Sequence, residues 1–260
     1  MAGGSAPRRD KSRIAKDALP FLGFLLSVLA VWEGLVRYFE IEAYLLPSVF
    51  EVWHELINRF GLLMQNAIVT INETVAGLMI GTVLGILIGV AIVYVRFIRT
   101  GVYPLIIGFQ SVPKVAVAPL LVIWFGYGIL SKIAMSFLIS FFPMVVATIA
   151  GLTSVPYRLV EYLKSMNGTE WQIFLKVRVP NSLPHLMDGF KVSLPLAVIG
   201  AIVGEFAASE VGLGALIMLS SSQQDTALIF ATLLVVSVIS MALFGLIVLL
   251  ERLIWWRAVS

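Results

Sequence analysis

The chain has 260 residues, of which 60% are hydrophobic and 13% are charged, and its mean hydropathy is +0.99. A soluble domain usually carries about 25% charged residues, so this composition excludes an ordinary water-soluble domain and predicts a surface that faces lipid. The net charge is only +3, and the lack of cysteine excludes disulfides and thiolate metal sites.

The first segment, residues 1–18, is predicted to be a basic cytoplasmic tail. Its basic residues are Arg8, Arg9, Lys11, Arg13 and Lys16. Basic segments beside membrane spans stay on the cytoplasmic side. A secretory signal peptide over residues 8–30 is a competing interpretation. It is disfavoured because no small-residue cleavage site follows and further apolar segments come later. Residues 19–255 then form one membrane domain.

Six apolar segments are long enough to cross a membrane, which takes about 20 residues for a helix. They are residues 19–37, 69–95, 101–125, 131–152, 186–206 and 227–250. The third is interrupted by Pro104, Pro113, Lys114 and Pro119, so its continuity stays open. Buried neighbours can satisfy the backbone groups that such prolines free. We expect an all-α membrane protein with about six transmembrane helices.

The charges of the connecting segments differ between the two sides of the membrane. With the N-terminus inside, the cytoplasmic segments 96–100, 153–185 and 251–260 carry most of the remaining Lys and Arg residues. The outer segment 38–68 instead carries four glutamates. This bias predicts that both termini are cytoplasmic.

The second span contains Gly77, Gly81, Gly85 and Gly89, which recur every four residues. At helical pitch they form a nearly straight strip along which another helix backbone can approach closely. Packing within one subunit is the favoured interpretation, and dimerisation through this face is the alternative.

The longest internal polar segment, residues 153–185, lies on the predicted cytoplasmic side. Two short helices fit it, at about 157–166 and 169–177. Between them stand Asn167 and Gly168, two residue types that tolerate a left-handed backbone. We therefore expect a sharp turn between the two helices.

Large apolar side chains occupy one face of the second short helix. Trp171, Phe174 and Leu175 follow each other at i, i+3 and i+4. On a cytosolic loop such side chains require a partner, either the loop itself or a groove on another protein.

The spacing of this loop resembles that of importer permeases of the ATP-binding-cassette (ABC) superfamily. Their loop has Glu-Ala-Ala, three residues, Gly, nine residues and Ile-x-Leu-Pro. Here Glu161 begins Glu-Tyr-Leu, Asn167 follows after three residues, and Val-Arg-Val-Pro180 follows after nine more. The spacing matches throughout. Tyr and Leu replace the two alanines, Asn replaces Gly, and valines replace Ile and Leu.

Other motifs extend the resemblance to about residues 20–255. They are Leu45-Leu46-Pro47-Ser48, Ser111-Val112-Pro113-Lys114, Ala118-Pro119-Leu120, Trp124-Phe125-Gly126 and Gly204-Glu205-Phe206. They occur in the same order in one branch of these permeases, which resembles the nitrate, sulfonate or taurine, bicarbonate and pyrimidine-precursor importers.

The resemblance implies a type I ABC importer permease fold and a multi-pass location in a bacterial inner membrane. It implies a pathway formed by two permease copies, often a homodimer, and a cytosolic ABC ATPase dimer that grips one such loop from each. It also implies a periplasmic or lipid-anchored binding protein that delivers a small solute. The residues it assigns to the ATPase-coupling loop are Glu161, Asn167, Gly168, Trp171, Phe174 and Pro180.

Catalytic motifs are lacking in the sequence. There is no G-x-x-x-x-G-K-[ST] phosphate loop and no nucleophile–base constellation. His54 and His185 lie far apart, so no metal site is predicted. We expect a transport subunit that is not an enzyme and binds no cofactor, with ATP and magnesium on the partner ATPase. Nucleic-acid binding is not expected, because the basic residues flank spans and form no patch.

Ionisable residues inside spans are costly and are functional candidates. Lys114 and Glu205 are the candidates for a pathway or gate role, and an intersubunit structural pair is the alternative. Gln110, Ser111 and Ser193 are candidates for hydrogen bonds along the pathway. A cation at Lys114 would suit an anionic solute such as a sulfonate.

Two other classes of membrane protein fit the sequence less well than an importer permease. A secondary transporter driven by an ion gradient usually has two related halves with broken helices in matching positions, and no such pairing is evident. A membrane-embedded enzyme would need a catalytic cluster. The transported solute is not determined by the sequence.

Overall fold

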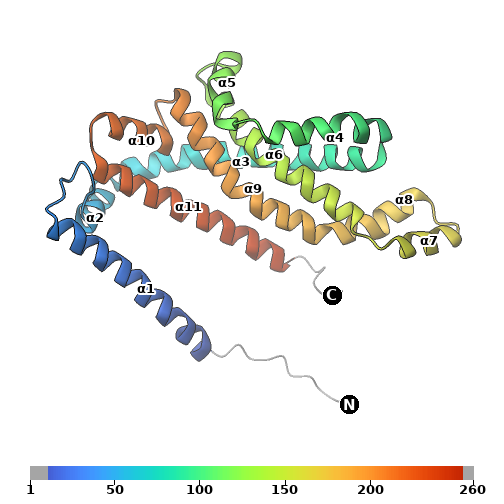
Figure 1. Ribbon diagram of the computed structural model, residues 1–260, viewed down its shortest axis with the longest axis horizontal. Coiled ribbons are helices and arrows are strands. Elements are labelled where there is room, and N and C mark those ends of the chain that lie inside the picture. Colours follow the sequence, from blue (N-terminus) through green and yellow to red (C-terminus); the bar gives the residue numbers. More distant parts are fainter. Residues whose placement is uncertain (1–10, 254–260) are drawn as a thin grey trace. The chain divides into compact units, whose positions relative to one another are not determined.

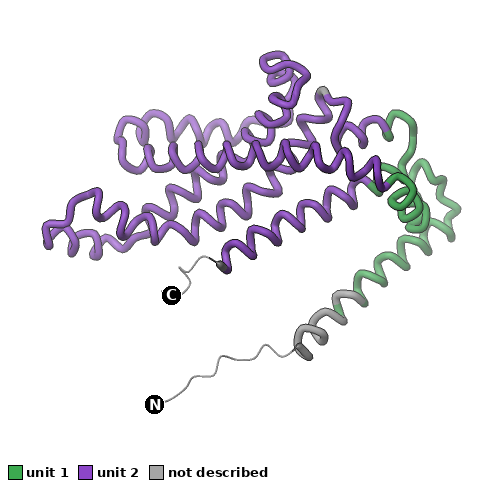
Figure 2. The backbone as a smooth tube through the Cα atoms, turned by 180° about the vertical axis from the view of Figure 1, so that it is seen from behind, with its two compact units in different colours: residues 1–59, 220–231 green, residues 60–219, 232–260 purple. Residues whose placement is uncertain are grey.

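The structure, a computed structural model, describes residues 11–253, and all regular structure in this range is helical. Residues 1–10 of the predicted tail lie outside the described residues, and residues 11–18 begin the first helix, α1. The chain forms two compact units, residues 1–59 with 220–231 and residues 60–219 with 232–260 (Figure 2).

The first unit holds α1 (Lys11–Tyr38) and α2 (Val49–Asn58), joined by a short turn (Figure 1). Ser48 caps α2 in a capping box with Glu51. The carboxylate of Glu33 on α1 accepts a hydrogen bond from the Val49 backbone N at 2.9 Å. Glu33, an ionisable residue near the end of the first predicted span, therefore has a structural role at the start of α2.

The second unit is organised around α6 (Ile129–Thr153), which packs against both α3 (Phe60–Tyr94) and α9 (Val179–Ala208). Met135 and Val145 on α6 are fully buried, as are Ala197 and Ala201 on α9. The core of this unit is thus a contact of three long helices.

The four glycines of the strip on α3 face α6 of the same chain. Their neighbours on α6 are Ser136, Ser140, Met144 and Thr148, which are also spaced four residues apart. A Cβ atom added at Gly85 would lie 2.7 Å from the Cβ of Met144, and one added at Gly89 would lie 2.6 Å from the Cβ of Thr148. Because these four positions of α3 carry no side chain, the two helices can approach each other closely.

The third predicted span is broken. It consists of α4 (Arg96–Gln110), a 3-10 turn η1 (Lys114–Val117) and α5 (Ala118–Phe125), and the two halves are bent by 98°. Pro113 lacks a backbone N–H and has an extended ψ of 96°, so the helix cannot continue through it. Pro119 stands in the first turn of α5, where proline is well tolerated.

The fifth span begins earlier than the predicted residue 186. The loop contains α7 (Tyr157–Ser165) and α8 (Glu170–Ile173), and α8 continues through a π-helical turn, η2 (Phe174–Arg178), into α9. Pro180 does not end this helix, because it closely follows the π-helical turn, where the backbone hydrogen-bond pattern already changes.

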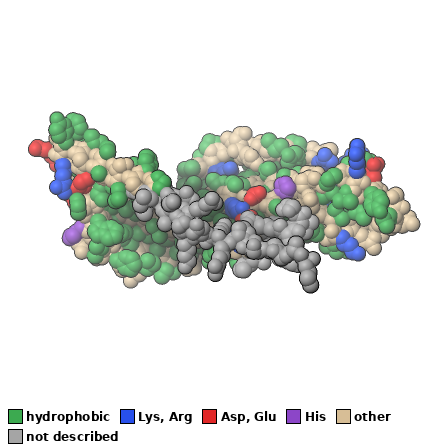
Figure 3. All heavy atoms as spheres, turned by 90° about the horizontal axis from the view of Figure 1, so that it is seen from below, with side chains coloured by type: hydrophobic (Ala, Val, Ile, Leu, Met, Phe, Trp, Pro, Cys, Tyr) green, Lys and Arg blue, Asp and Glu red, His purple; other side chains and the backbone are tan. Residues whose placement is uncertain are grey.

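Four described helices are long and apolar enough to cross a membrane: Phe60–Tyr94, Ile129–Thr153, Glu170–Ala207 and Thr226–Arg252. The bent pair would make a fifth, and α1 covers the first predicted span. Between α9 and α11 (Thr226–Leu253) lies the short helix α10 (Leu213–Ser222). Hydrophobic side chains are spread over the described part of the face in Figure 3, whereas charged ones occur in a few groups.

Candidate functional site

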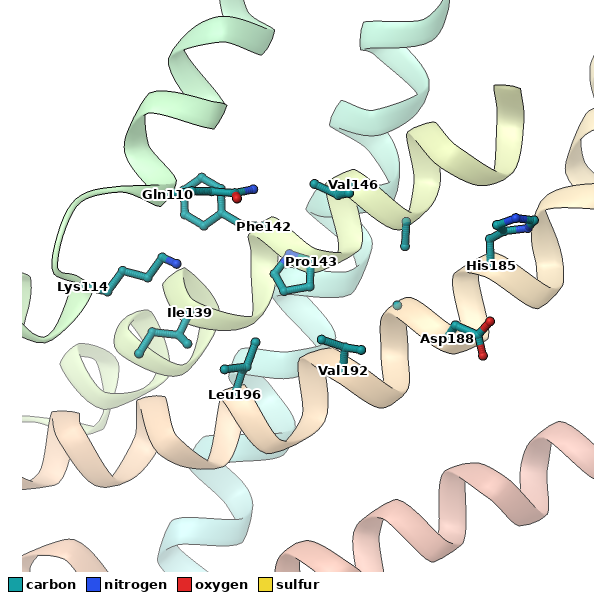
Figure 4. Close-up of a pocket in the computed structure, with 12 residues that line it drawn as sticks. Gln110, Lys114, Ile139, Phe142, Pro143, Val146, His185, Asp188, Val192 and Leu196 are labelled. Atoms are coloured by element: carbon teal, nitrogen blue, oxygen red, sulfur yellow. The ribbon is translucent and has the colours of Figure 1, made fainter. Parts of the chain in front are cut away.

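A cavity of about 480 Å³ lies in the second unit, between the break in the third span, α6 and α9 (Figure 4). Most of its walls are apolar, and they include Ile139, Phe142, Pro143, Val146, Val192 and Leu196. Its polar side chains are Gln110, Lys114, His185 and Asp188. The cavity is therefore largely apolar, with a few polar groups at defined positions.

Lys114 reaches this cavity because the helix break at Pro113 turns the chain over α6 (Figure 4). Its ammonium group lies 5.1 Å from the centre of the Phe142 ring, within the range of a cation–π contact. Gln110, the last residue of α4, also lines the cavity. Two of the predicted pathway residues are thus brought together here.

His185 and Asp188 enter the cavity from α9, and both were missed as site residues from the sequence. The Nδ1 atom of His185 is buried without a hydrogen-bond partner. Asp188 accepts a hydrogen bond from Lys191 at 3.2 Å. The predicted loop ended at residue 185, which left His185 outside the fifth predicted span, residues 186–206, whereas Asp188 lay at the start of that span. The only available signal was their i, i+3 spacing.

The two predicted pathway serines lie elsewhere. Ser111 is exposed at the end of α4. Ser193 is fully buried, and its hydroxyl donates to the backbone O of Ser140 at 3.0 Å. The Ser193 side chain therefore joins α9 to α6, and neither serine is among the residues that line the cavity.

Glu205 lies in a separate site from Lys114. No hydrogen bond or ion pair joins these two side chains in the part of the chain that the structure describes. Glu205 is 1% exposed. Its carboxylate accepts a hydrogen bond from the Thr70 hydroxyl at 2.7 Å. Thr70 escaped the sequence analysis because nothing in the sequence indicates which helix faces Glu205.

The turn in the cytoplasmic loop depends on two adjacent residues. Asn167 has a positive φ of 60°, the left-handed conformation expected for it. The Gly168 backbone N donates to the Leu163 O at 2.9 Å. A Cβ atom at Gly168 would lie 2.7 Å from that same oxygen. The loop therefore needs a left-handed residue at 167 and no side chain at 168.

The aromatic residues of the loop divide into an anchor and an exposed surface. Phe174 packs edge-on against Tyr94 at the end of α3, with ring centres 5.4 Å apart. Trp171 lies beside Phe174 at 5.6 Å and is 66% exposed. Ile173, which lies between them in the sequence, is buried. Phe174 thus fixes the loop to the helical core, and Trp171 is presented to solvent.

Charged groups surround this aromatic surface. Lys164 and Glu170 form an ion pair across the turn, with Nζ 2.5 Å from Oε1. Glu161 on α7 is exposed. Its carboxylate accepts a hydrogen bond from the Tyr157 hydroxyl and raises the pKa of Tyr157 above its ordinary value. Pro180 is exposed on the first turn of α9. The six residues that the family resemblance assigns to the ATPase-coupling loop thus extend from α7 to the first turn of α9.

Comparisons with known proteins place the chain among transport proteins. A family described as "Binding-protein-dependent transport system inner membrane component" matches residues 81–256. The riboflavin transport system permease protein RibX of Chloroflexus aurantiacus is 35% identical over 97% of this chain and 96% of its own length. The formylaminopyrimidine transport permease protein ThiX of Halalkalibacterium halodurans is 34% identical over 90% and 94%.

A solved structure shares the fold. It is an inward-facing conformation of the MetNI methionine ABC transporter, and the match has a TM-score of 0.63 at 24% sequence identity. It covers 78% of this chain and 98% of the matched one.

Proposed function

This chain belongs to the family of binding-protein-dependent transport system inner membrane components, and we propose that the cavity beside Lys114 is its share of the solute pathway. The chain is a multi-pass permease subunit of an ABC importer in the inner membrane. The observation that carries the proposal is the polar pair Lys114 and Gln110 beside the apolar walls of this cavity.

The proposed solute is a small nitrogen heterocycle of the pyrimidine-precursor kind. The cavity volume of about 480 Å³ falls within the roughly 300–1,000 Å³ of small-molecule sites. Its apolar walls suit the faces of a flat ring, while the Gln110 amide suits hydrogen bonds at its edge. Two relatives are named for riboflavin and formylaminopyrimidine, which are both nitrogen heterocycles.

An anionic solute such as a sulfonate is the second candidate, and the Lys114 ammonium favours it. Lys114 is the only Lys or Arg among the described residues that line the cavity. A hydrogen bond to a charged group contributes about 1.5–3 kcal/mol. Lys114 therefore matters far more for an anion than for a neutral ring.

The proposed partner proteins follow from the assignment of this chain as an importer permease. We propose that a second copy of this chain completes the pathway, and that a periplasmic solute-binding protein delivers the solute. ATP and magnesium bind to a separate cytosolic ATPase dimer, because this sequence has no phosphate loop. The exposed Trp171 beside the anchored Phe174 supports the loop as the ATPase contact.

Two variants test the cavity in the assembled importer. Val192→Trp puts a large ring into the cavity from a half-exposed position on α9, so solute uptake should fall strongly while complex yield stays normal. Lys114→Gln should weaken uptake of a sulfonate by about tenfold or more and change uptake of a neutral pyrimidine precursor little. Lys114→Arg, which keeps the charge, is the matched control. Undiminished uptake by Val192→Trp would exclude this cavity from the pathway.

A further inference from the structure

Two buried carboxyl groups meet where α3, α9 and the start of α10 come together. Glu73 on α3 is 2% exposed, and Glu205 on α9 is 1% exposed. Their carboxyl groups are close enough to act on each other directly. Within residues 11–253, no Lys or Arg forms an ion pair with either one at 4.0 Å or less. We call Glu73 and Glu205 the acid pair.

Glu205 has the surroundings of an ionised carboxylate. Its Oε1 accepts from the Thr70 hydroxyl at 2.7 Å, and its Oε2 accepts from the Gly214 backbone N at 2.5 Å. Gly214 lies in the first turn of α10, where unpaired N–H groups and the helix dipole favour a negative charge. Both oxygens of Glu205 are therefore used as acceptors.

The same contacts hold the start of α10 in place. The Leu213 N donates to the Thr70 hydroxyl oxygen at 2.9 Å, and the Gly212 N donates to the Asn66 side-chain oxygen at 2.7 Å. Gly212 has a positive φ of 111°, and a Cβ atom there would collide with the Glu205 carboxyl group. Residues of α3 and α9 thus bind three successive N–H groups at the beginning of α10.

Glu73 has the opposite surroundings. Its Oε2 is buried without a hydrogen-bond partner. Lys132 on α6 and Glu210 line a cavity of about 680 Å³ together with Glu73. The Lys132 ammonium, however, donates to the backbone oxygens of Tyr127 and Gly128. Lys132 is therefore held by two carbonyl oxygens, although its positive charge still acts on Glu73 from a distance. Glu210 adds another acid to this region.

Two carboxylates in contact and shielded from water cannot both be ionised. We propose that Glu73 and Glu205 share one proton, which is carried by Glu73 and donated to Glu205. The acid pair is then a proton-binding site that fixes α10 to α3 and α9. In the orientation that the charge distribution predicts, the acid pair lies toward the outer end of the permease. The proposal does not depend on the transported solute.

Glutamine substitutions distinguish the two members of the pair. Glu73→Gln supplies a neutral group that still donates to Glu205, so the assembled importer should keep its yield and unfolding temperature. Glu205→Gln removes the negative charge that accepts from the Thr70 hydroxyl and the Gly214 N, and it forces the Thr70 hydroxyl either to face an amide N–H or to turn to the Asn66 backbone O. Yield and unfolding temperature should therefore fall. Equal effects of both substitutions, or damage by Glu73→Gln alone, would overturn the assignment of the proton to Glu73.

Infrared spectroscopy of the purified importer in an ester-free detergent at neutral pH observes the proton itself. We expect the carbonyl band of a protonated carboxylic acid, which shifts in D₂O, to be present in the wild type and lost in Glu73→Gln. The exposed Glu42 provides the control, because Glu42→Gln should retain the band. A wild type without this band, or a band that survives in Glu73→Gln, would show that the pair does not hold a proton on Glu73, even if Glu205→Gln fails to fold.

Discussion

Replacing Gly77 by leucine should nearly abolish the yield of folded permease. A Cβ atom at this position would collide with the Ser136 side chain and lie 2.8 Å from the Phe137 backbone N on α6. Backbone atoms cannot rotate aside. On its other side α6 is held by α9, where a Cβ at Gly200 would lie 2.6 Å from the Ser136 Cα. Overpacking typically costs about 1–3 kcal/mol and occasionally more, and here the added side chain would meet the backbone of a helix that is packed on two sides.

The measurement is the amount of monodisperse protein extracted from the membrane and its unfolding temperature. Gly245→Leu on α11 is the matched control, because nothing in the described chain lies within 4 Å of a Cβ atom at Gly245. We expect near-normal yield for the control. A stable, active Gly77→Leu variant would contradict the close packing of α3 on α6.

Replacing Trp171 by alanine should detach the ATPase partner and abolish ATP-driven uptake. Truncating a central aromatic anchor commonly costs about 2 kcal/mol or more at an interface, which is roughly a thirtyfold loss of affinity. The loop should stay folded, because Phe174 remains packed against Tyr94 and Thr169 still caps α8. The loss would therefore report the missing contact rather than a collapsed loop.

Copurification of the ATPase with the permease measures this effect, and the amount of permease in the membrane controls for insertion. Tyr127 supplies the matched variant. It is 78% exposed and lies before α6, outside the loop, so Tyr127→Ala should leave copurification unchanged. If Trp171→Ala kept both the ATPase and uptake, the loop would not be the ATPase contact at this residue.

Much of the helical framework follows from the sequence, because apolar length alone identifies α3, α6 and α11. The Asn167–Gly168 turn was also predicted, since few residue types accept the left-handed backbone found at Asn167. The start of the fifth span was predicted too late. Residues 178–185 were assigned to the polar loop, whereas in the structure the helix continues through Pro180, which follows the π-helical turn η2.

The contacts of the polar residues could not be predicted from the sequence. Helical periodicity places Thr70 and Glu73 near each other on α3, but it does not state which helix they face. Thr70 and Glu205 bond to each other across 135 residues of chain, and only the packing of α3 on α9 brings them together. Lys114 was recognised as unusual, yet its approach to Phe142 depends on the 98° bend of the third span.

Uptake of solute by reconstituted proteoliposomes tests most directly whether this chain is a permease driven by a separate ATPase. Vesicles would contain the permease with or without its cognate ATPase, with the binding protein outside and ATP inside. We predict uptake only when permease, ATPase, binding protein and ATP are all present, and none when an ion gradient replaces ATP. Uptake by the permease alone under an ion gradient, with no need for the ATPase, would contradict this function.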